Sequence, residues 1–309
     1  MKYITKTLDF QLDHASVITL GKFDGLHRGH QKLVNKALEI GKQGYETVVF
    51  TFDISPLVKL GSRIKRTLLT NEERRNLLER MNVDCLIECP FVQELIQMEP
   101  EEFIEQILVR RLRASFLVVG PDFRFGYQRK GTSQVLQEFS SKYGYKVVVL
   151  EKEQNDHREI SSTWIRELIR EGRMENVNDL LGYPYFVKGT VVRGRQLGRT
   201  WGLPTINQIP SDSKLLPPFG VYASRTTING KTYYGISNVG VKPTVKESFA
   251  GVETYLFNCN ENLYGKEAWV EFYHFVRPEC KFDSLEELRE QIQRDAAVGR
   301  KYFAWLNSY

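Results

Sequence analysis

The sequence has few cysteines, no long hydrophobic run and no strong excess of charge of either sign. Its four cysteines, Cys85, Cys89, Cys259 and Cys280, form no CxxC pair, and their spacing indicates neither a disulfide framework nor a zinc site. No stretch of about 18 apolar residues is present, so no membrane span is predicted. The first ten residues lack the apolar region of a secretory signal. We therefore expect a cytoplasmic protein without a membrane partner.

The net charge is small for a chain of this length. Lys and Arg number 43 against 38 Asp and Glu, a formal charge of +5, which suits either nucleic acid or small anionic ligands. Short basic runs near Lys65 and at Arg110 and Arg111 lack the interleaved aromatic residues of a nucleic-acid track. We interpret them as solvated faces and expect no nucleic-acid partner. Nothing in the pattern indicates an oligomeric state.

The composition is that of a globular protein, with 41% hydrophobic and 26% charged residues. A chain of 309 residues is about twice the length of a usual domain, which favours two domains. Helical periodicity fades near Gly182 and Pro184. We predict domains at 1–182 and 183–309.

Residues 1–182 alternate apolar runs with amphipathic stretches, the pattern of repeated βαβ units. This order predicts a parallel, doubly wound sheet that binds ligands at the carboxyl ends of its strands, near a switch point. The predicted strands are 16–21, 46–52, 83–89, 115–120 and 145–151, and the predicted helices are around 30–42, 70–81, 100–113 and 131–143.

The stretch GKFDGLHRGH, residues 21–30, directly follows the first of these predicted strands. If a helix begins near Leu26, His27 and His30 lie one turn apart and point at the same group. Free N–H groups at a helix start favour an anion, and Gly21 and Gly25 allow the backbone to approach it closely. The pattern predicts a phosphate site. A glycine-rich turn with two surface histidines is the alternative.

Two further segments follow predicted strands in the same region. GPDFRFG, residues 120–126, comes after the fourth strand, and ISSTWIR, residues 160–166, comes after the fifth and a charged turn. The serines and threonine of ISSTWIR are placed to cap the next helix. Both segments are therefore candidate parts of a ligand site.

Residues 183–309 have the pattern of short strands rich in Val, Tyr, Thr and Phe, which predicts a compact antiparallel barrel, with a sandwich as the alternative. Asn229 and Gly230 suit a type I′ turn. Ser284 is placed to cap a final helix that should pack on the barrel through a face including Leu285, Leu288 and Ile292. The predicted strands are 184–192, 220–228, 231–239, 252–258 and 267–276.

Five motifs in order, GxFDGxHxGH, GxDFRFG, ISSTxIR, GxxLGRxxGxPTxN and VETYLF, resemble those of the bacterial bifunctional riboflavin kinase/FAD synthetases. The resemblance covers nearly the whole chain. It implies a Rossmann-like HxGH nucleotidyltransferase domain that adenylates FMN to FAD, and a barrel domain that phosphorylates riboflavin to FMN. It also implies ATP as co-substrate, Mg²⁺ as cofactor, and riboflavin, FMN and FAD as the small-molecule ligands.

In the first domain, the resemblance makes His27 and His30 catalytic. Adenylyl transfer needs no covalent enzyme intermediate, so the protein chiefly positions reactants and neutralises charge. Imidazoles near their pKa suit this role because they donate hydrogen bonds to phosphate oxygens and can become cationic. Asp24 would assist Mg²⁺ or orient a histidine, or serve only as a turn residue. The nucleotide-binding residues implied are Gly21, Phe23, Asp24, Gly25, His27, His30, Asp122, Arg124, Gly126, Ser161, Ser162, Thr163 and Arg166.

Phe123 and Phe125, inside the second motif, have a structural alternative as core residues. ISSTWIR taken alone is also an ordinary helix cap. In the family, its hydroxyls and helix amides hold the triphosphate while Arg166 adds a fixed positive charge.

In the second domain, the resemblance makes Glu253 the general base that accepts the proton of the ribityl hydroxyl. Thr205 and Asn207 supply hard oxygen ligands for Mg²⁺. Arg277 would contact the flavin or close the site, with a surface arginine as the alternative. A glycine-rich flap over ATP completes the implied nucleotide site: Gly194, Gly198, Arg199, Gly202, Pro204 and Thr205.

The chain departs from the family pattern at two places. Residues 52–56 are FDISP where the family has a sequence close to FxPHP, and Leu203 and Ile206 replace phenylalanine and alanine around PTxN. Along an extended segment Ile206 points away from Thr205 and Asn207, so the metal pair is retained. FDISP raises the hypothesis of a riboflavin kinase with a weak or regulatory adenylyltransferase domain. A module that binds nucleotide, flavin or RNA without turnover is the third hypothesis.

Overall fold

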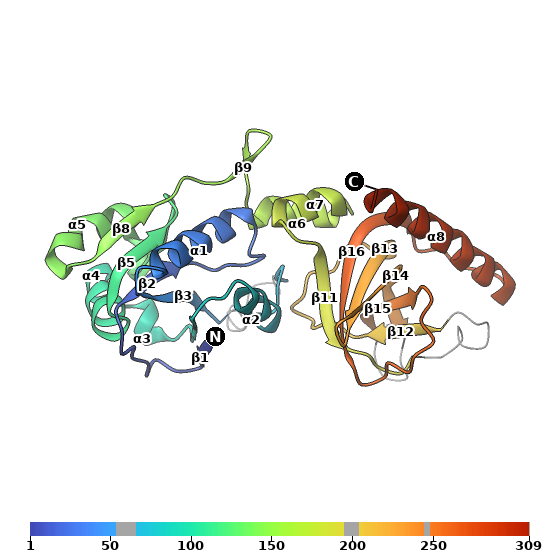
Figure 1. Ribbon diagram of the computed structural model, residues 1–309, viewed down its shortest axis with the longest axis horizontal. Coiled ribbons are helices and arrows are strands. Elements are labelled where there is room, and N and C mark those ends of the chain that lie inside the picture. The colour runs from blue at the N-terminus through green and yellow to red at the C-terminus, as the bar shows by residue number, and fades with distance from the viewer. Residues whose placement is uncertain (54–65, 195–203, 244–247, 309) are drawn as a thin grey trace. The chain divides into compact units, whose positions relative to one another are not determined.

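The computed structural model describes residues 1–53, 66–194, 204–243 and 248–308 of the chain. It divides into two compact units, Met1–Ser162 and Thr163–Tyr309, and most of their helices and strands are labelled in Figure 1. Each unit is built around its own six-stranded sheet.

The sheet of the first unit is parallel throughout, with the strand order β1-β4-β3-β2-β5-β8. After β2 the chain adds β3 and β4 on one side and β5 on the other, so the switch point lies beside β2 (Figure 1). This confirms the predicted doubly wound sheet. The strands are β1 (Lys2–Thr5), β2 (Ser16–Leu20), β3 (Glu46–Phe52), β4 (Cys85–Cys89), β5 (Ala114–Val119) and β8 (Lys146–Val149).

The four predicted helical segments of this unit are present, and the one near 100–113 starts as an α-helix and continues as a π-helix. The short helix at Gln93–Ile96 was not predicted. The edge strand β1 was not predicted, because its four residues are at most half-buried and show no apolar run. The helices are α1 (Arg28–Gly41), α2 (Asn71–Arg80), α3 (Gln93–Ile96), α4 (Pro100–Phe103), the π-helix η2 (Ile104–Arg111) and α5 (Ser133–Tyr143). Smaller elements are β6 (Arg124–Phe125), η3 (Tyr127–Arg129), β7 (Gly131–Thr132), β9 (Gln154–Asn155) and β10 (Arg158–Glu159).

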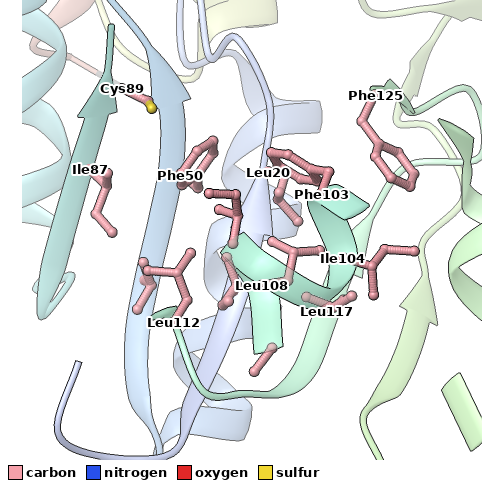
Figure 2. Packing of buried hydrophobic residues seen from close by; sticks show 14 of the residues in the cluster. Leu20, Phe50, Ile87, Cys89, Phe103, Ile104, Leu108, Leu112, Leu117 and Phe125 are labelled. Carbon is pink, nitrogen blue, oxygen red and sulfur yellow. The ribbon is translucent and has the colours of Figure 1, made fainter. Parts of the chain in front are cut away.

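Apolar side chains cover both faces of the parallel sheet, which explains why its strands are continuous hydrophobic runs. On one face Val17 and Val118 pack against Ala37 and Ile40 of α1. The opposite face carries the larger cluster, drawn in Figure 2, in which side chains from the strands meet those of α4 and η2. Its labelled members are Leu20, Phe50, Ile87, Cys89, Phe103, Ile104, Leu108, Leu112, Leu117 and Phe125. The core thus holds the strand ends in fixed positions.

The second unit contains one antiparallel sheet in the order β11-β16-β13-β14-β15-β12. Among the described residues, the segment just after β11 bridges to β12, where the N–H of Val192 donates to the carbonyl of Asn207 at 2.8 Å. The Gln208 amide also donates to the carbonyl of Gly189 at 2.9 Å. A single sheet whose edges meet is a barrel rather than a sandwich. The strands are β11 (Tyr185–Thr190), β12 (Thr205–Gln208), β13 (Gly220–Ile228), β14 (Lys231–Pro243), β15 (Ser248–Leu256) and β16 (Glu267–Pro278).

The turn between β13 and β14 has the predicted conformation, with φ of 51° at Asn229 and 76° at Gly230. The strand β12 was not predicted as a separate strand. Its four residues are too few to show a clear period. Two short helices precede the barrel and one long helix follows it: α6 (Ser162–Arg170), α7 (Met174–Leu181) and α8 (Leu285–Leu306).

Helix α8 packs on the barrel as predicted, and the Ser284 hydroxyl caps it by accepting from the N–H of Glu287 at 3.1 Å. Ala296 and Phe303 are buried apolar contacts of the helix with the sheet. The predicted face was wrong at Leu285, which is 57% exposed. Among the described residues, the stripe that contacts the sheet starts near Ile292, two turns into the helix.

Candidate active sites

The loop GKFDGL leaves the carboxyl end of β2 beside the switch point, in an unusual backbone conformation. The φ angles of Phe23, Gly25 and Leu26 are 48°, 87° and 35°. Positive φ is unfavourable for the two residues with side chains, so the surrounding structure must hold the loop. A Cβ at Gly21 would lie 3.3 Å from the Phe23 ring. Helix α1 begins at Arg28, two residues later than expected, and His27 is its N-cap.

His27 and His30 come together at the start of α1, as the spacing predicted. Their rings stack with centroids 3.7 Å apart, and His27 Nδ1 accepts from the N–H of His30 at 3.4 Å. Burial lowers the pKa of His27 to about 4. Burial and the neighbouring His27 hold the pKa of His30 well below its usual value. Both rings are therefore neutral near pH 7, so the expectation of imidazoles close to their pKa was wrong.

His30 has a feature that points to a ligand. Its Nδ1 is buried and has no hydrogen-bond partner among the residues that the structure describes, and its ring lies edge-on to Phe23 at 5.3 Å. A buried polar atom normally has a partner. If Nδ1 carries the proton, a phosphate oxygen at this position would accept it; if Nδ1 carries no proton, a water at this position would donate to it.

Asp24 connects the GKFDGL loop to the residues before α2 and to α6. Its carboxylate Oδ1 accepts from the backbone N–H of Leu68 at 2.8 Å and of Leu69 at 3.3 Å. Its own carbonyl accepts from the hydroxyl of Ser162 at 2.7 Å. The Asp24 side chain is buried, so these contacts account for an anchoring role. Of the remaining ISSTWIR residues, Ser161 directly precedes α6, and Thr163 and Arg166 lie on α6.

The segment GPDFRFG leaves the end of β5, across the switch point from the GKFDGL loop. Phe125 is buried and Phe123 stacks on it at 5.6 Å within the main core cluster, which agrees with their structural alternative. Asp122 pairs with Lys152 at 3.0 Å and Arg124 is exposed. Gly126 has φ of 69°, and a Cβ there would lie 3.0 Å from the Pro100 nitrogen.

The polar residues predicted for the second site lie on the adjacent strands β12 and β15. Asn207 pairs in register with Glu253, so their side chains share one face of the sheet. The Thr205 hydroxyl donates to Glu253 Oε1 at 2.7 Å. Ile206 and Gln208 are buried on the opposite face. This confirms that Ile206 points away from Thr205 and Asn207.

Gly194 approaches this group closely. A Cβ at Gly194 would lie 2.5 Å from Asn207 Nδ2 and 3.1 Å from Asn207 Oδ1. Only a glycine leaves room for the Asn207 side chain in its observed position. The structure thus brings Gly194, Thr205, Asn207 and Glu253 together at one place.

A cavity of about 330 Å³ adjoins Thr205 and Pro204. One wall comes from a segment that the sequence did not single out, because its polar residues match no motif of known chemistry. The lining residues are Val191, Pro204, Thr205, Ile206, Leu256 and the loop 259–264. The volume is at the small end of ligand sites, about 300–1,000 Å³.

Arg277 is not a surface arginine. It forms a forked ion pair with Asp295 of α8, with Nε 3.0 Å from both carboxylate oxygens and Nη2 2.8 Å from Oδ2. The Asp295 side chain is 3% exposed. Arg277 therefore ties β16 to α8, and its guanidinium is already largely engaged.

Some predicted residues fall outside the described part of the chain, namely Gly198, Arg199 and Gly202 and the last three residues of FDISP. Among the described residues, no group of three or more His, Cys, Asp and Glu side chains is placed to hold a metal ion. Within the same residues, no helix is long and apolar enough to cross a membrane.

Comparison with known proteins first identifies two enzyme domains. The FAD synthetase family model matches residues 9–164, and the riboflavin kinase family model matches residues 181–303. A solved structure described as a macrolide-efflux protein from Streptococcus pneumoniae is 30% identical, with a TM-score of 0.85, and covers 97% of this chain and 99% of that one.

Two relatives described as bifunctional riboflavin kinase/FMN adenylyltransferase match nearly the whole chain. The protein from Listeria monocytogenes is 36% identical and covers 97% of this chain and 96% of its own length. The protein from Bacillus subtilis is 37% identical, covering 94% and 93%. The chain belongs to the family of bifunctional riboflavin kinase/FMN adenylyltransferases, which confirms the resemblance seen in its five motifs.

Proposed function

We propose that this chain converts riboflavin to FMN and FMN to FAD at two separate ATP-dependent sites. Its family membership over nearly the full length carries the proposal. The placement of the two residue groups supports it, because one group lies at the switch point of a parallel sheet and the other on one face of a barrel. The cytoplasm, where ATP is abundant, is the proposed location.

At the first site, the FMN phosphate attacks the α-phosphorus of ATP and pyrophosphate leaves. The enzyme's main task is to align the reactants and stabilise the charge of the transition state. His27 and His30, neutral without ligand, donate N–H hydrogen bonds to phosphate oxygens. The negative charge of the bound triphosphate raises the pKa of both rings. The hydroxyls of Ser161, Ser162 and Thr163 hold the phosphates further along, with Arg166 as a fixed charge.

At the second site, the terminal hydroxyl of riboflavin attacks the γ-phosphorus of another ATP, and ADP leaves. Glu253 accepts the proton of that hydroxyl. One of its oxygens already accepts from Thr205, but a carboxylate has about four lone-pair positions, so the group can accept the proton as well. The cavity beside Thr205 and Pro204 is the proposed place for the nucleoside of this ATP.

A divalent cation belongs to both reactions, and we propose Mg²⁺. At the kinase site, Thr205 and Asn207 would hold it together with phosphate oxygens, a set of hard oxygen ligands that suits Mg²⁺. The Thr205 proton points to Glu253, which leaves the lone pairs of its oxygen for the metal. The cation would neutralise charge on the phosphates.

The test is incubation of the purified chain with riboflavin, ATP and Mg²⁺, followed by chromatography of the flavins. We expect FMN and then FAD. In His30→Ala, FMN should form and FAD should not. In Glu253→Ala, FAD should form only when FMN is supplied. Formation of neither flavin by the unchanged chain would refute the proposal, and FMN alone at long times would favour a kinase with a weak adenylyltransferase domain.

A further inference from the structure

The loop that carries the adenylyltransferase residues is held by a buried arginine that belongs to no motif. Arg74, on the first turn of α2, is fully buried. Its Nη1 donates to the carbonyl of Lys22 at 3.1 Å, and its Nη2 lies 3.3 Å from the carbonyl of Phe52. Lys22 lies in the GKFDGL loop after β2, and Phe52 is the last residue of β3. One guanidinium therefore contacts the ends of two neighbouring strands at the edge of the sheet where the site lies.

The charge of Arg74 is balanced locally. Glu88 on β4 is 1% exposed and its Oε1 lies 2.5 Å from Arg74 Nη2. The Tyr3 hydroxyl of β1 donates to the other Glu88 oxygen. Asn71 adds a further acceptor at 3.2 Å. Burying an ion pair costs much of what its attraction returns, so stability alone does not explain why this pair lies here.

The geometry explains the choice of arginine. Backbone carbonyls buried at the strand ends need donors, and here one planar group serves two carbonyls, an amide and a carboxylate. A lysine ammonium is a single point and cannot reach all four in these positions. The loop that it holds contains the positive φ angles of Phe23 and Leu26, which persist only when their surroundings determine them.

The residues just before α2 hold the GKFDGL loop at a second point. The N–H groups of Leu68 and Leu69, just before α2, bind the Asp24 carboxylate. Asn71 donates to Asp53 at 2.7 Å, which joins the start of α2 to the residue after β3. The start of α2 and the residues before it thus contact both segments that lead away from the ends of β2 and β3.

We propose that Arg74, with Glu88 as its counter-charge, is a positioning residue for adenylyl transfer. It acts by fixing the backbone at Lys22 and thereby the direction in which the loop presents His27 and His30. It has no part in phosphorylation of riboflavin. This inference rests on the proposed function of the first domain.

Arg75 provides a matched control. It is the neighbouring residue and also pairs with Glu88, at 3.7 Å. It is partly exposed and stacks over the Tyr3 ring at 4.4 Å. Within the described part of the chain it contacts Asn71, Glu88 and the Tyr3 ring, and neither Lys22 nor Phe52. Changes at the two arginines therefore separate pairing with Glu88 from support of the loop.

The experiment compares Arg74→Lys with Arg75→Lys in the full chain. FAD formation from FMN and ATP gives kcat and KM, and riboflavin phosphorylation by the same preparation serves as an internal reference. We expect Arg74→Lys to lower kcat for FAD formation by about 10- to 100-fold, since a displacement near 1 Å costs about 100-fold. Phosphorylation should be unchanged. Arg75→Lys should leave both reactions within about twofold.

A double variant separates positioning from stability. Arg74→Met with Glu88→Met removes both charges and retains volume, a type of change that is often neutral or stabilising for the fold. We expect unfolding at or above the temperature of the unchanged chain together with reduced FAD formation. If the double variant is less stable than the unchanged chain, the comparison of Arg74→Lys with Arg75→Lys decides whether Arg74 positions the loop.

The outcomes are distinct. Near-normal FAD formation in a stable double variant, or equal losses in the two lysine variants, would overturn the role of Arg74. Absence of FAD formation in the unchanged chain would instead refute the proposed function. A selective loss in Arg74→Lys with phosphorylation intact supports the inference.

Discussion

Substitution of Gly194 by alanine should disable riboflavin phosphorylation without unfolding the barrel. The added Cβ would lie 2.5 Å from Asn207 Nδ2 and 2.8 Å from its Cγ. Heavy atoms in contact are ordinarily about 3.5 Å apart or more, so the Asn207 side chain must retreat by about 1 Å. The atom displaced is the end of a side chain, which can move at small cost to stability.

The consequence for activity is much larger than for stability. A displacement of about 1 Å at a reacting centre costs roughly 100-fold in rate, so we expect kcat for FMN formation to fall by about that factor. The Mg²⁺ concentration for half-maximal rate should rise, because Asn207 is a proposed ligand. FAD formation from supplied FMN should be unchanged, and so should the unfolding temperature.

Gly189→Ala is the matched control, since a Cβ at that position meets Gln208 Nε2 at an ordinary 3.6 Å. It should leave phosphorylation within about twofold. If Gly194→Ala retained phosphorylation at a comparable level, the placement of Asn207 at the kinase site would be wrong. Loss of both reactions in Gly194→Ala would indicate general misfolding and would equally contradict the steric argument.

Two further predictions concern pH and the final helix. The pKa of His27 falls from 6.5 unfolded to about 4 folded, so the unfolded state takes up the proton first. Between pH 6.5 and pH 5, His27 therefore lowers the free energy of unfolding by about 1.5 kcal/mol. His27→Asn retains a capping acceptor and should lose less unfolding free energy as the pH falls, measured by denaturant titration at each pH. An equal dependence on pH in the variant and the unchanged chain would refute the low pKa of His27. Asp295→Asn leaves Arg277 without its counter-charge and should lower the free energy of unfolding by about 3 kcal/mol, whereas Glu290→Gln, at an exposed pair with Arg294, should lower it by less than 1. Equal effects in the same titration would contradict the structural role of Arg277.

The sequence predicted the layout of both units because their signals are local. Continuous apolar runs such as Glu46–Phe52 mark strands buried on both faces, and Asn229 and Gly230 mark a turn by their allowed φ angles. Short elements gave no such signal. β1 and β12 have four residues each, and they are strands because neighbouring strands supply hydrogen-bond partners.

The candidate sites were predictable where a motif fixes the spacing of residues. His27 and His30 are one helical turn apart, and Asn207 and Glu253 are aligned by strand register. Contacts between distant segments were not predictable. The interactions of Asp24 with Leu68, and of Arg277 with Asp295, depend on tertiary packing. The low pKa of His27 has the same origin, because burial causes it.

The bridge that joins the edges of the barrel includes a proposed metal ligand. The backbone of Asn207 accepts from Val192 at this seam, while its side chain lies at the kinase site. Local opening of a protein begins where few hydrogen bonds hold a segment, and among the described residues this seam is held by the Val192 N–H and the Gln208 amide. Each opening of the seam would therefore dismantle the kinase site, and substrates that bind there would slow hydrogen exchange at the Val192 amide.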